Sequence, residues 1–191
     1  MKNSESGFTI PELLTVIVII GVLISIVAIY MVITQRRTAQ QSIVEILKQE
    51  IRNVYAMADS AEKNGAGYRY KYRMEFKRND ESPPTCYRIM KGESADGTTW
   101  TWSVVPPVKG TSYKIVDQVN GWIQLGTPGN TYINSYTNMN SVDSGANYGF
   151  TLVSKGSIVE KEPVVDSTIV IRSSGQPDIT VTVNQYGSVT D

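Results

Sequence analysis

The residue with the clearest chemical demand is Glu12, a carboxylate that stands near the start of a long apolar run. Removing a charged carboxylate from water without a partner is costly, and an ionisable residue at the edge of a membrane span is by default a candidate for function. Gly7 and Phe8 precede it in the stretch GFTIPE. We therefore expect Glu12 to need a polar partner.

The other residue types argue against catalysis. The 191 residues include 18 basic and 18 acidic side chains, no histidine and one cysteine, Cys86. Histidine is the commonest general base and metal ligand near neutral pH, and one cysteine excludes an internal disulfide or a multi-cysteine zinc site. The sequence contains no catalytic or phosphate-binding motif, so we expect no enzyme and no cofactor. A calcium loop around Asn138, Asn140, Asp143 and Ser144 is the less favoured alternative to a solvated turn.

The apolar run from Leu13 to Ile33 has no charge and no proline. About twenty such residues in a helix span the roughly 30 Å of a hydrocarbon core. A secretory signal, an ordinary anchor and a prepilin-type signal are the three interpretations. The run is too long for a secretory signal, and the small residue Gly7 lies before it rather than after it. Arg36 and Arg37, just past the run, oppose the prepilin orientation under the positive-inside rule, and we give the motif more weight.

The segment GFTIPELLTVIVIIGVLISI resembles the class III signal of type IV pilins and type II secretion pseudopilins. Gly7, Phe8 and Glu12 match three positions of that signal, Gly21 matches a common mid-span glycine, and Pro11 is acceptable in a first helical turn. The resemblance implies cleavage between Gly7 and Phe8, N-methylation of Phe8, and pairing of Glu12 with the free amine of a neighbouring subunit. The alternative for Glu12 is a headgroup-level carboxylate favoured by the helix dipole alone.

The resemblance also implies partners and a location. The partners are a prepilin peptidase and methyltransferase, an inner-membrane assembly platform, other pilin or pseudopilin subunits, and membrane lipid before assembly. The chain would cross the bacterial inner membrane once, with its C-terminal part outside the cytoplasm, and then enter a filament. We expect a leader at 1–7, a membrane-spanning or filament-core helix at 8–33, the amphipathic half of the same helix at 34–64, and a β-rich domain at 65–191.

Periodicity predicts an α+β fold. After the span, apolar residues continue at helical steps as far as Glu62, at Ile43, Leu47, Ile51 (or Val54), Ala58 and Ala61. Beyond Gly67 the period becomes two, and short strands are predicted at YRYKYRMEFKR, CYRIMK, TWTWSVV, SYKIVDQV, GWIQL, YGFTLVS, STIVIRS and DITVTVN, with polar turns between them. We expect the second half of the helix to pack on an antiparallel sheet or small sandwich.

The first of these strands alternates aromatic with charged residues, and this raises a second function. A basic stripe that tracks DNA phosphates would use Arg69, Lys71, Arg73, Lys77 and Arg78. The simpler interpretation is the solvated face of an amphipathic strand, with Glu75 interrupting the stripe. The C-terminal tail QYGSVTD has no basic residue, so DNA is not expected as a partner.

The glycine-punctuated C-terminal third is similar to the end of H-class pseudopilins and FimT-like minor pilins, with turns expected at Gly156, Gly175 and Gly187. Two functions stay open. The favoured one is a structural subunit, a minor pilin or pseudopilin, of a type IV pilus or a type II secretion pseudopilus. The alternative is a pilus-associated module that captures DNA or a surface. The sequence leaves open whether the machine serves secretion, twitching, adhesion or DNA uptake.

Overall fold

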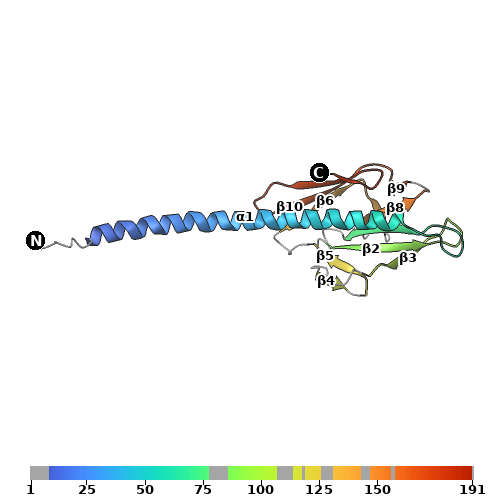
Figure 1. Ribbon diagram of the computed structural model, residues 1–191, viewed down its shortest axis with the longest axis horizontal. Coiled ribbons are helices and arrows are strands. Elements are labelled where there is room, and N and C mark those ends of the chain that lie inside the picture. Colours follow the sequence, from blue (N-terminus) through green and yellow to red (C-terminus); the bar gives the residue numbers. More distant parts are fainter. Residues whose placement is uncertain are drawn as a thin grey trace, which may run out of the picture.

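The computed structural model describes residues 9–77, 86–106, 114–117, 119–125, 131–142, 147–155 and 158–190. Within these ranges one long helix, α1 (Ile10–Asp59), precedes a β region. Figure 1 shows the N-terminal half of α1 projecting away from all the strands. The strands are β1 (Lys71–Lys77), β2 (Cys86–Glu93), β3 (Thr101–Val104), β4 (Lys114–Asp117), β5 (Trp122–Gln124), β6 (Thr131–Thr137), β7 (Asn140–Val142), β8 (Asn147–Ser154), β9 (Val159–Glu162), β10 (Ser167–Ser173), β11 (Ile179–Val183) and β12 (Val189–Thr190).

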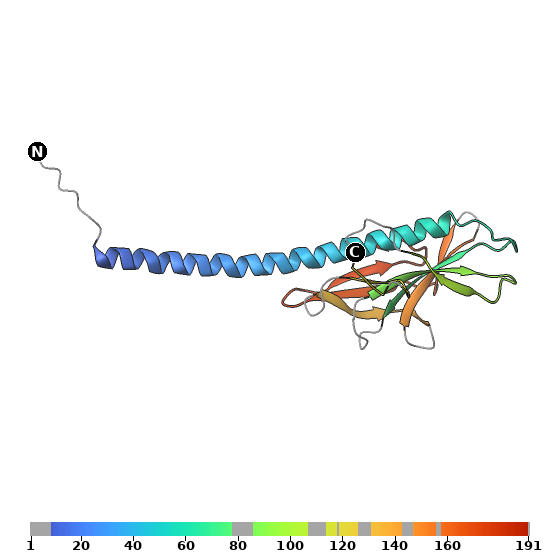
Figure 2. The same ribbon diagram turned by 90° about the horizontal axis from the view of Figure 1, so that it is seen from below.

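The helix is close to the length that the sequence predicts. Its 50 residues measure about 75 Å at 1.5 Å per residue, and Figure 2 shows that they follow a smooth curve. Pro11 lies in the first turn, where a proline costs no intrahelical hydrogen bond. The helix ends at Asp59, three residues before the predicted Glu62, and the hydroxyl of the capping residue Ser60 donates to the Ala56 carbonyl (2.7 Å).

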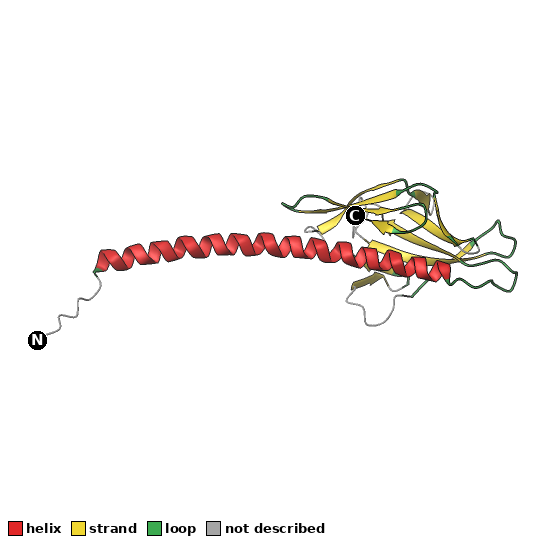
Figure 3. Ribbon diagram, turned by 45° about the horizontal axis from the view of Figure 1, so that its top comes forward, coloured by secondary structure: helices red, strands yellow, loops and turns green. Residues whose placement is uncertain are grey.

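The strands form two antiparallel sheets. The larger has the order β4-β5-β2-β1-β8-β7, with β3 also paired to β2 and β9 to β8. The smaller has the order β12-β11-β10-β6. The C-terminal half of α1 contacts strands of both sheets, as Figure 3 also shows. The predicted α+β architecture, a long helix packed by its second half on antiparallel sheets, is confirmed.

The core lies between the buried face of α1 and the two sheets. The helical positions predicted to face the core are buried, and Leu47, Ile51, Val54 and Ala58 have no exposed surface. The sheets contribute apolar side chains at alternate positions, among them Met74, Phe76, Tyr87, Ile89, Phe150, Leu152, Ile169, Ile171, Val181 and Val183. One continuous cluster therefore holds both sheets on the same helix.

Four strands, β6, β7, β9 and β12, lie outside the strands that the sequence predicts. β6 and β7 occupy stretches rich in Thr, Asn and Ser, which single-sequence propensity assigns to loops. β6 forms because it pairs with β10 and places Ile133 in the core. Asn138, with φ of 55°, lies between β6 in one sheet and β7 in the other. Asparagine is among the residues that adopt this left-handed conformation most readily.

Candidate functional site

Glu12 lies in the first turn of α1, and its carboxylate turns back toward Thr9, the residue that caps the helix. Its Oε2 accepts the Thr9 backbone N–H at 2.9 Å and the Thr9 hydroxyl at 2.7 Å. Glu12 therefore has a polar partner within the chain itself. Sequence reasoning missed this partner, although Thr-x-x-Glu before an apolar run is the signature of a capping box. Gly7 and Phe8 lie outside the described residues, so cleavage and methylation stay predictions.

The half of α1 that follows Glu12 is exposed in the isolated chain. Every residue from 10 to 39 is exposed, and α1 is the one helix in the described part of the chain that is long and apolar enough to cross a membrane. The hydroxyls within it bond to backbone carbonyls one turn earlier, and these bonds run from Thr15 to Pro11, Ser25 to Gly21 and Thr34 to Tyr30. Such bonds satisfy the hydroxyl groups where no water is present.

The β region begins to cover α1 at Gln40, whose side chain is 1% exposed. Its Nε2 donates to the Ile171 carbonyl at 3.1 Å and to the Pro177 carbonyl at 3.0 Å. One helical turn earlier, Arg36 Nη1 donates to the Ser174 carbonyl at 3.4 Å. These three bonds fasten the turn of the β10–β11 hairpin to the helix at the point where its apolar half leaves the β region.

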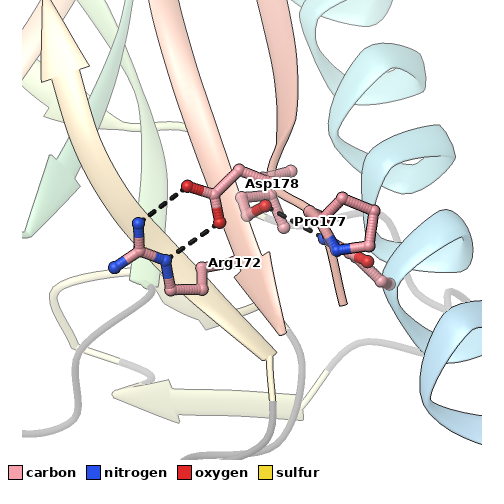
Figure 4. Close-up of polar contacts among 5 residues, drawn as sticks. Arg172, Pro177 and Asp178 are labelled. Atoms are coloured by element: carbon pink, nitrogen blue, oxygen red, sulfur yellow. Dashed lines mark hydrogen bonds and ion pairs between the residues drawn. The ribbon is translucent and has the colours of Figure 1, made fainter. Parts of the chain in front are cut away.

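The hairpin itself is closed by an ion pair between its two strands. Arg172 Nε and Nη2 donate to Asp178 Oδ1 and Oδ2 at 2.9 and 2.8 Å, and Figure 4 shows the two side chains facing each other with Pro177 on the side of α1. The guanidinium lowers the pKa of the Asp178 carboxyl. Gly175 occupies the turn with φ of 75°, a conformation that favours glycine.

The basic residues considered for DNA contact are engaged within the chain where they are described. Arg78 lies outside the described residues. The other four contact the Ala61 carbonyl (Arg69, 2.9 Å), the Glu162 carboxylate (Lys71, 3.5 Å), the Glu75 carboxylate (Arg73) and the Trp122 ring (Lys77, 5.3 Å to its centroid).

The interpretation of the charged side of β1 as a solvated face is wrong. Glu75 has no exposed surface and pairs with Arg73 and Arg88, whose side chains are 12% exposed. The cations lie in turn against the three tryptophans of the chain: Lys71 over Trp100, Arg73 over Trp102, and Arg88 and Lys77 over Trp122. We call this set of eight side chains the tryptophan–cation layer.

The layer forms because strands beyond β2 send aromatic rings back across the sheet. Trp102 of β3 pairs with Gly92 of β2, and a Cβ at Gly92 would lie 2.9 Å from the Trp102 ring. The glycine therefore lets the ring pass over β2 to Arg73, 4.0 Å from the ring centroid. Period-two alternation in β1 indicates which residues share a face but gives no sign of what covers that face.

A second buried cation joins the two sheets. Lys161 of β9 has no exposed surface, and its Nζ donates to the Pro163 carbonyl at 2.7 Å and to Ser167 Oγ at 2.8 Å. Ser167 begins β10 of the smaller sheet, and its hydroxyl donates to the Asn138 carbonyl at 2.6 Å. Burial lowers the pKa of Lys161 to about 8, and nearby Asp166 opposes the shift. No sequence motif marks this lysine.

Few side chains of the β region are of the kinds that support catalysis or metal binding. Within the described ranges, no three His, Cys, Asp or Glu side chains lie together in a way that could hold a metal ion. Asn138 and Asn140 of the considered calcium loop lie at the β6–β7 corner, and Asp143 and Ser144 lie outside the described residues. Cys86 is buried, and this burial raises the pKa of its thiol.

Comparison with known proteins bears on the N-terminal end of this arrangement. Residues 2–28 match the family described as the prokaryotic N-terminal methylation motif. No curated protein and no solved structure is similar enough to the chain to count as a match. The chain thus carries a prepilin-type signal on an exposed apolar helix. This combination supports a general relationship to the type IV pilins and pseudopilins, and a structural rather than an enzymatic role.

Proposed function

We propose that this protein is a structural subunit of a type IV pilus or a type II secretion pseudopilus, either a FimT-like minor pilin or an H-class pseudopilin. Residues 1–7 are the leader, 8–33 the helix that crosses the inner membrane and later lines the filament core, 34–64 the amphipathic half of that helix, and 65–191 the β-rich domain outside the cytoplasm. A prepilin peptidase cuts between Gly7 and Phe8, Phe8 is N-methylated, and the assembly platform extracts the subunit into the filament.

One observation carries the proposal: the methylation motif at 2–28 continues into a helical half that no other part of the described chain covers. Each fully exposed Val, Leu or Ile side chain forgoes about 1.5–3 kcal/mol of burial, so a surface of this size needs lipid or neighbouring helices around it. A methylated pilin-type helix is surrounded by lipid before assembly and by neighbouring helices in the filament. The short strand β12 and the glycine turn at Gly187 support the minor pilin or H-class assignment.

Glu12 sets the axial register in this proposal. Both of its bonds to Thr9 end on Oε2, so within the described residues Oε1 is left for the amine of a neighbouring Phe8. The Thr9 bonds hold the carboxylate at the helix end in advance and reduce the side-chain entropy lost on pairing. A pair of unit charges at 4 Å is worth about 4 kcal/mol at an effective dielectric of 20 before desolvation is subtracted.

Mass spectrometry of the protein from its native cells tests processing. We expect a chain that begins at methylated Phe8, and we expect Gly7→Leu to keep residues 1–7, because a bulky side chain replaces the small residue at the cleavage site. Ser4→Leu, an equally bulky change elsewhere in the leader, is the matched control and should be processed normally. An intact Met1 in the unmodified protein, or a Gly7→Leu chain that still begins at Phe8, would overturn the proposal.

Capture of DNA or of a surface is the alternative function. The described basic residues considered for DNA contact are engaged with carboxylates, a carbonyl and a tryptophan ring of the same chain. No observation favours the alternative, and we do not propose it.

A further inference from the structure

The β10–β11 hairpin turn lies closer to the apolar half of α1 than the rest of the β region does. Figures 1, 2 and 3 agree that this turn reaches furthest back along the helix toward the N-terminus. The Arg36–Ser174 bond and the two Gln40 bonds hold it there. The position of the turn along the helix axis is therefore set by Gln40 together with Arg36.

That position coincides with the edge of the apolar run. Arg36 follows Ile33, the last apolar residue of the run, by a rise of about 4.5 Å. Helical side chains also tilt toward the N-terminus, so the Arg36 guanidinium and the Ser174 carbonyl lie nearer still to Ile33. The headgroup layer on each side of a bilayer is about 5–7 Å thick. When the apolar run occupies the hydrocarbon core, the hairpin turn lies within the headgroups.

In the described residues of the helix and of the hairpin turn, the charges at this level have one sign. Arg36 and Arg37 are exposed, and the sequence from 34 to 42 and from 174 to 177 contains no acidic residue. Asp178, the nearest carboxylate of the hairpin, is bound on both oxygens by Arg172. Guanidinium groups bind phosphate oxygens through several parallel N–H donors. Arg36 donates one N–H to the Ser174 carbonyl, and Arg37 is exposed to solvent. Both guanidinium groups therefore keep N–H donors that can bind phosphate.

We propose that Arg36, Arg37 and the turn Ser174–Gln176 form a membrane-facing surface that binds the phosphates of phospholipid headgroups while the subunit waits in the bilayer. This inference rests on the proposed function, since it requires the apolar half of α1 to be inserted. The surface fixes how the β region stands on the membrane before extraction. It also gives the two arginines a role on the side of the membrane that the positive-inside rule disfavours.

Fluorescence quenching in bilayers tests the proposal. The full chain is reconstituted with a fluorophore on Ser174→Cys, on Thr99→Cys in the loop before β3, or on Ile20→Cys in the apolar run. Cys86 is fully buried, so labelling goes to the introduced cysteine, and a Cys86→Ala chain checks this. We expect a lipid that carries a quencher on its headgroup to quench Ser174→Cys at least about threefold more than Thr99→Cys, since only the former lies in the headgroup layer.

The third label separates this inference from the proposed function. Ile20→Cys should be quenched by a lipid that carries its quencher on the acyl chain. If it is quenched while Ser174→Cys is no more quenched than Thr99→Cys, the headgroup surface is wrong and insertion stands. If Ile20→Cys is not quenched, the helix has not inserted and both proposals fail.

Charge-removing variants test the phosphate contact. Adding anionic phospholipid to a zwitterionic bilayer should increase the quenching of Ser174→Cys, because each arginine near an anionic surface favours contact by about fivefold. Arg37→Gln should lose most of that increase, and Arg36→Gln/Arg37→Gln should lose all of it. Arg52→Gln, further along the same helix, is the matched control and should keep it. An increase that survives in the double variant would contradict binding through these arginines.

Discussion

Among single residues, Thr9 and Glu12 show how a carboxylate is kept at the end of an apolar helix. The two bonds from Thr9 satisfy Oε2 within the subunit, so the monomer does not hold a fully unpartnered charge. The gain on assembly is therefore the extra attraction of a neighbouring amine, reduced by the cost of desolvating both groups. The local contact lowers the cost of the monomer in the membrane and directs the carboxylate toward the N-terminal end, where a partner would arrive.

Removal of this carboxylate should separate insertion from assembly. We expect Glu12→Ala to insert into membranes as the unmodified chain does, because the apolar run is unchanged, but to enter filaments about tenfold less, which corresponds to about 1.4 kcal/mol. Glu45→Ala, which removes an exposed carboxylate of the same helix, is the control. The measurement compares the membrane fraction with the filament fraction released by shearing, and equal filament yields for all three chains would count against pairing through Glu12.

Lys161 should give the protein a distinctive pH dependence. Its pKa of about 8 lies below the ordinary value near 10.4, so between these values the unfolded chain binds a proton that the folded chain does not. The free energy of unfolding should therefore rise with pH across this window, by up to about 1.4 kcal/mol per unit. Below pH 8 both states are protonated, and the penalty for burying the charge is fully present.

Denaturant unfolding in detergent at pH 7 to 10 measures this effect against Lys161→Met, which keeps the apolar stem and cannot titrate. The advantage of the unmodified chain over the variant should grow as the pH rises. Lys155→Met, at an exposed lysine paired with Glu160, should show no such trend. A constant difference between the unmodified chain and Lys161→Met would show that the lysine does not titrate in this range.

At the scale of elements, β1 is covered on both faces. Met74 and Phe76 meet the core below α1, and Glu75 lies on the opposite face, within the tryptophan–cation layer. The layer does for this face what a second sheet or a helix does elsewhere, because aromatic rings and arginine stems exclude water from the ion pairs. β1 is therefore a central strand, although its sequence resembles that of a strand exposed on one side.

Glu75→Gln tests the layer. The variant keeps the shape of the side chain but leaves Arg73 and Arg88 without their shared counter-charge, and breaking such a buried pair costs about 3–5 kcal/mol. Glu93→Gln, at an exposed carboxylate that pairs with Lys91 at 3.6 Å, should cost less than about 1 kcal/mol. Thermal unfolding of the two variants gives the comparison, and similar melting temperatures would mean that the layer contributes little.

On the scale of the whole molecule, α1 belongs to two environments. Its buried face from Gln40 onward packs on the core that holds both sheets together, whereas residues 10–39 are exposed and contribute nothing to that core. The β region with the second half of α1 should therefore fold without the apolar half. Arg36 and Gln40 lie where the two halves of α1 meet, and both bond to the β10–β11 hairpin.

Two truncated chains test this division. A chain that begins at Gln35 should be soluble, monomeric and cooperatively folded. A chain that begins at Gln41 lacks the bonds to Ser174, Ile171 and Pro177. Loss of the buried bond to the Ile171 carbonyl should by itself lower the free energy of unfolding by about 1–3 kcal/mol. Circular dichroism and denaturant titration measure both quantities. Aggregation of the first chain, or equal stability of the two, would show that the division lies elsewhere.

Local patterns by themselves determined the helix, its buried face, most of the strands and the N-terminal motif. These features repeat at 3.6 or two residues, or have a fixed spacing from Gly7 to Glu12, so neighbours in the sequence contain the information. β6 and β7 could not be predicted in this way, since polar residues form them only because β10 and β8 supply hydrogen-bond partners.

The tertiary structure alone decided what the polar side chains of the β region do. The cover on Glu75 and the attachment of the hairpin turn to Arg36 and Gln40 join residues far apart in the sequence. Lys161 and its partner Ser167 are only six residues apart, but Ser167 in turn bonds to the distant Asn138 carbonyl. Whether a charge on a strand faces water or a tryptophan depends on which distant strand lies above it, and no local period records that. The sequence therefore indicates an apolar helix that lies in lipid or in a filament. The fold shows where the exposed half of α1 ends and how the β region is held to it.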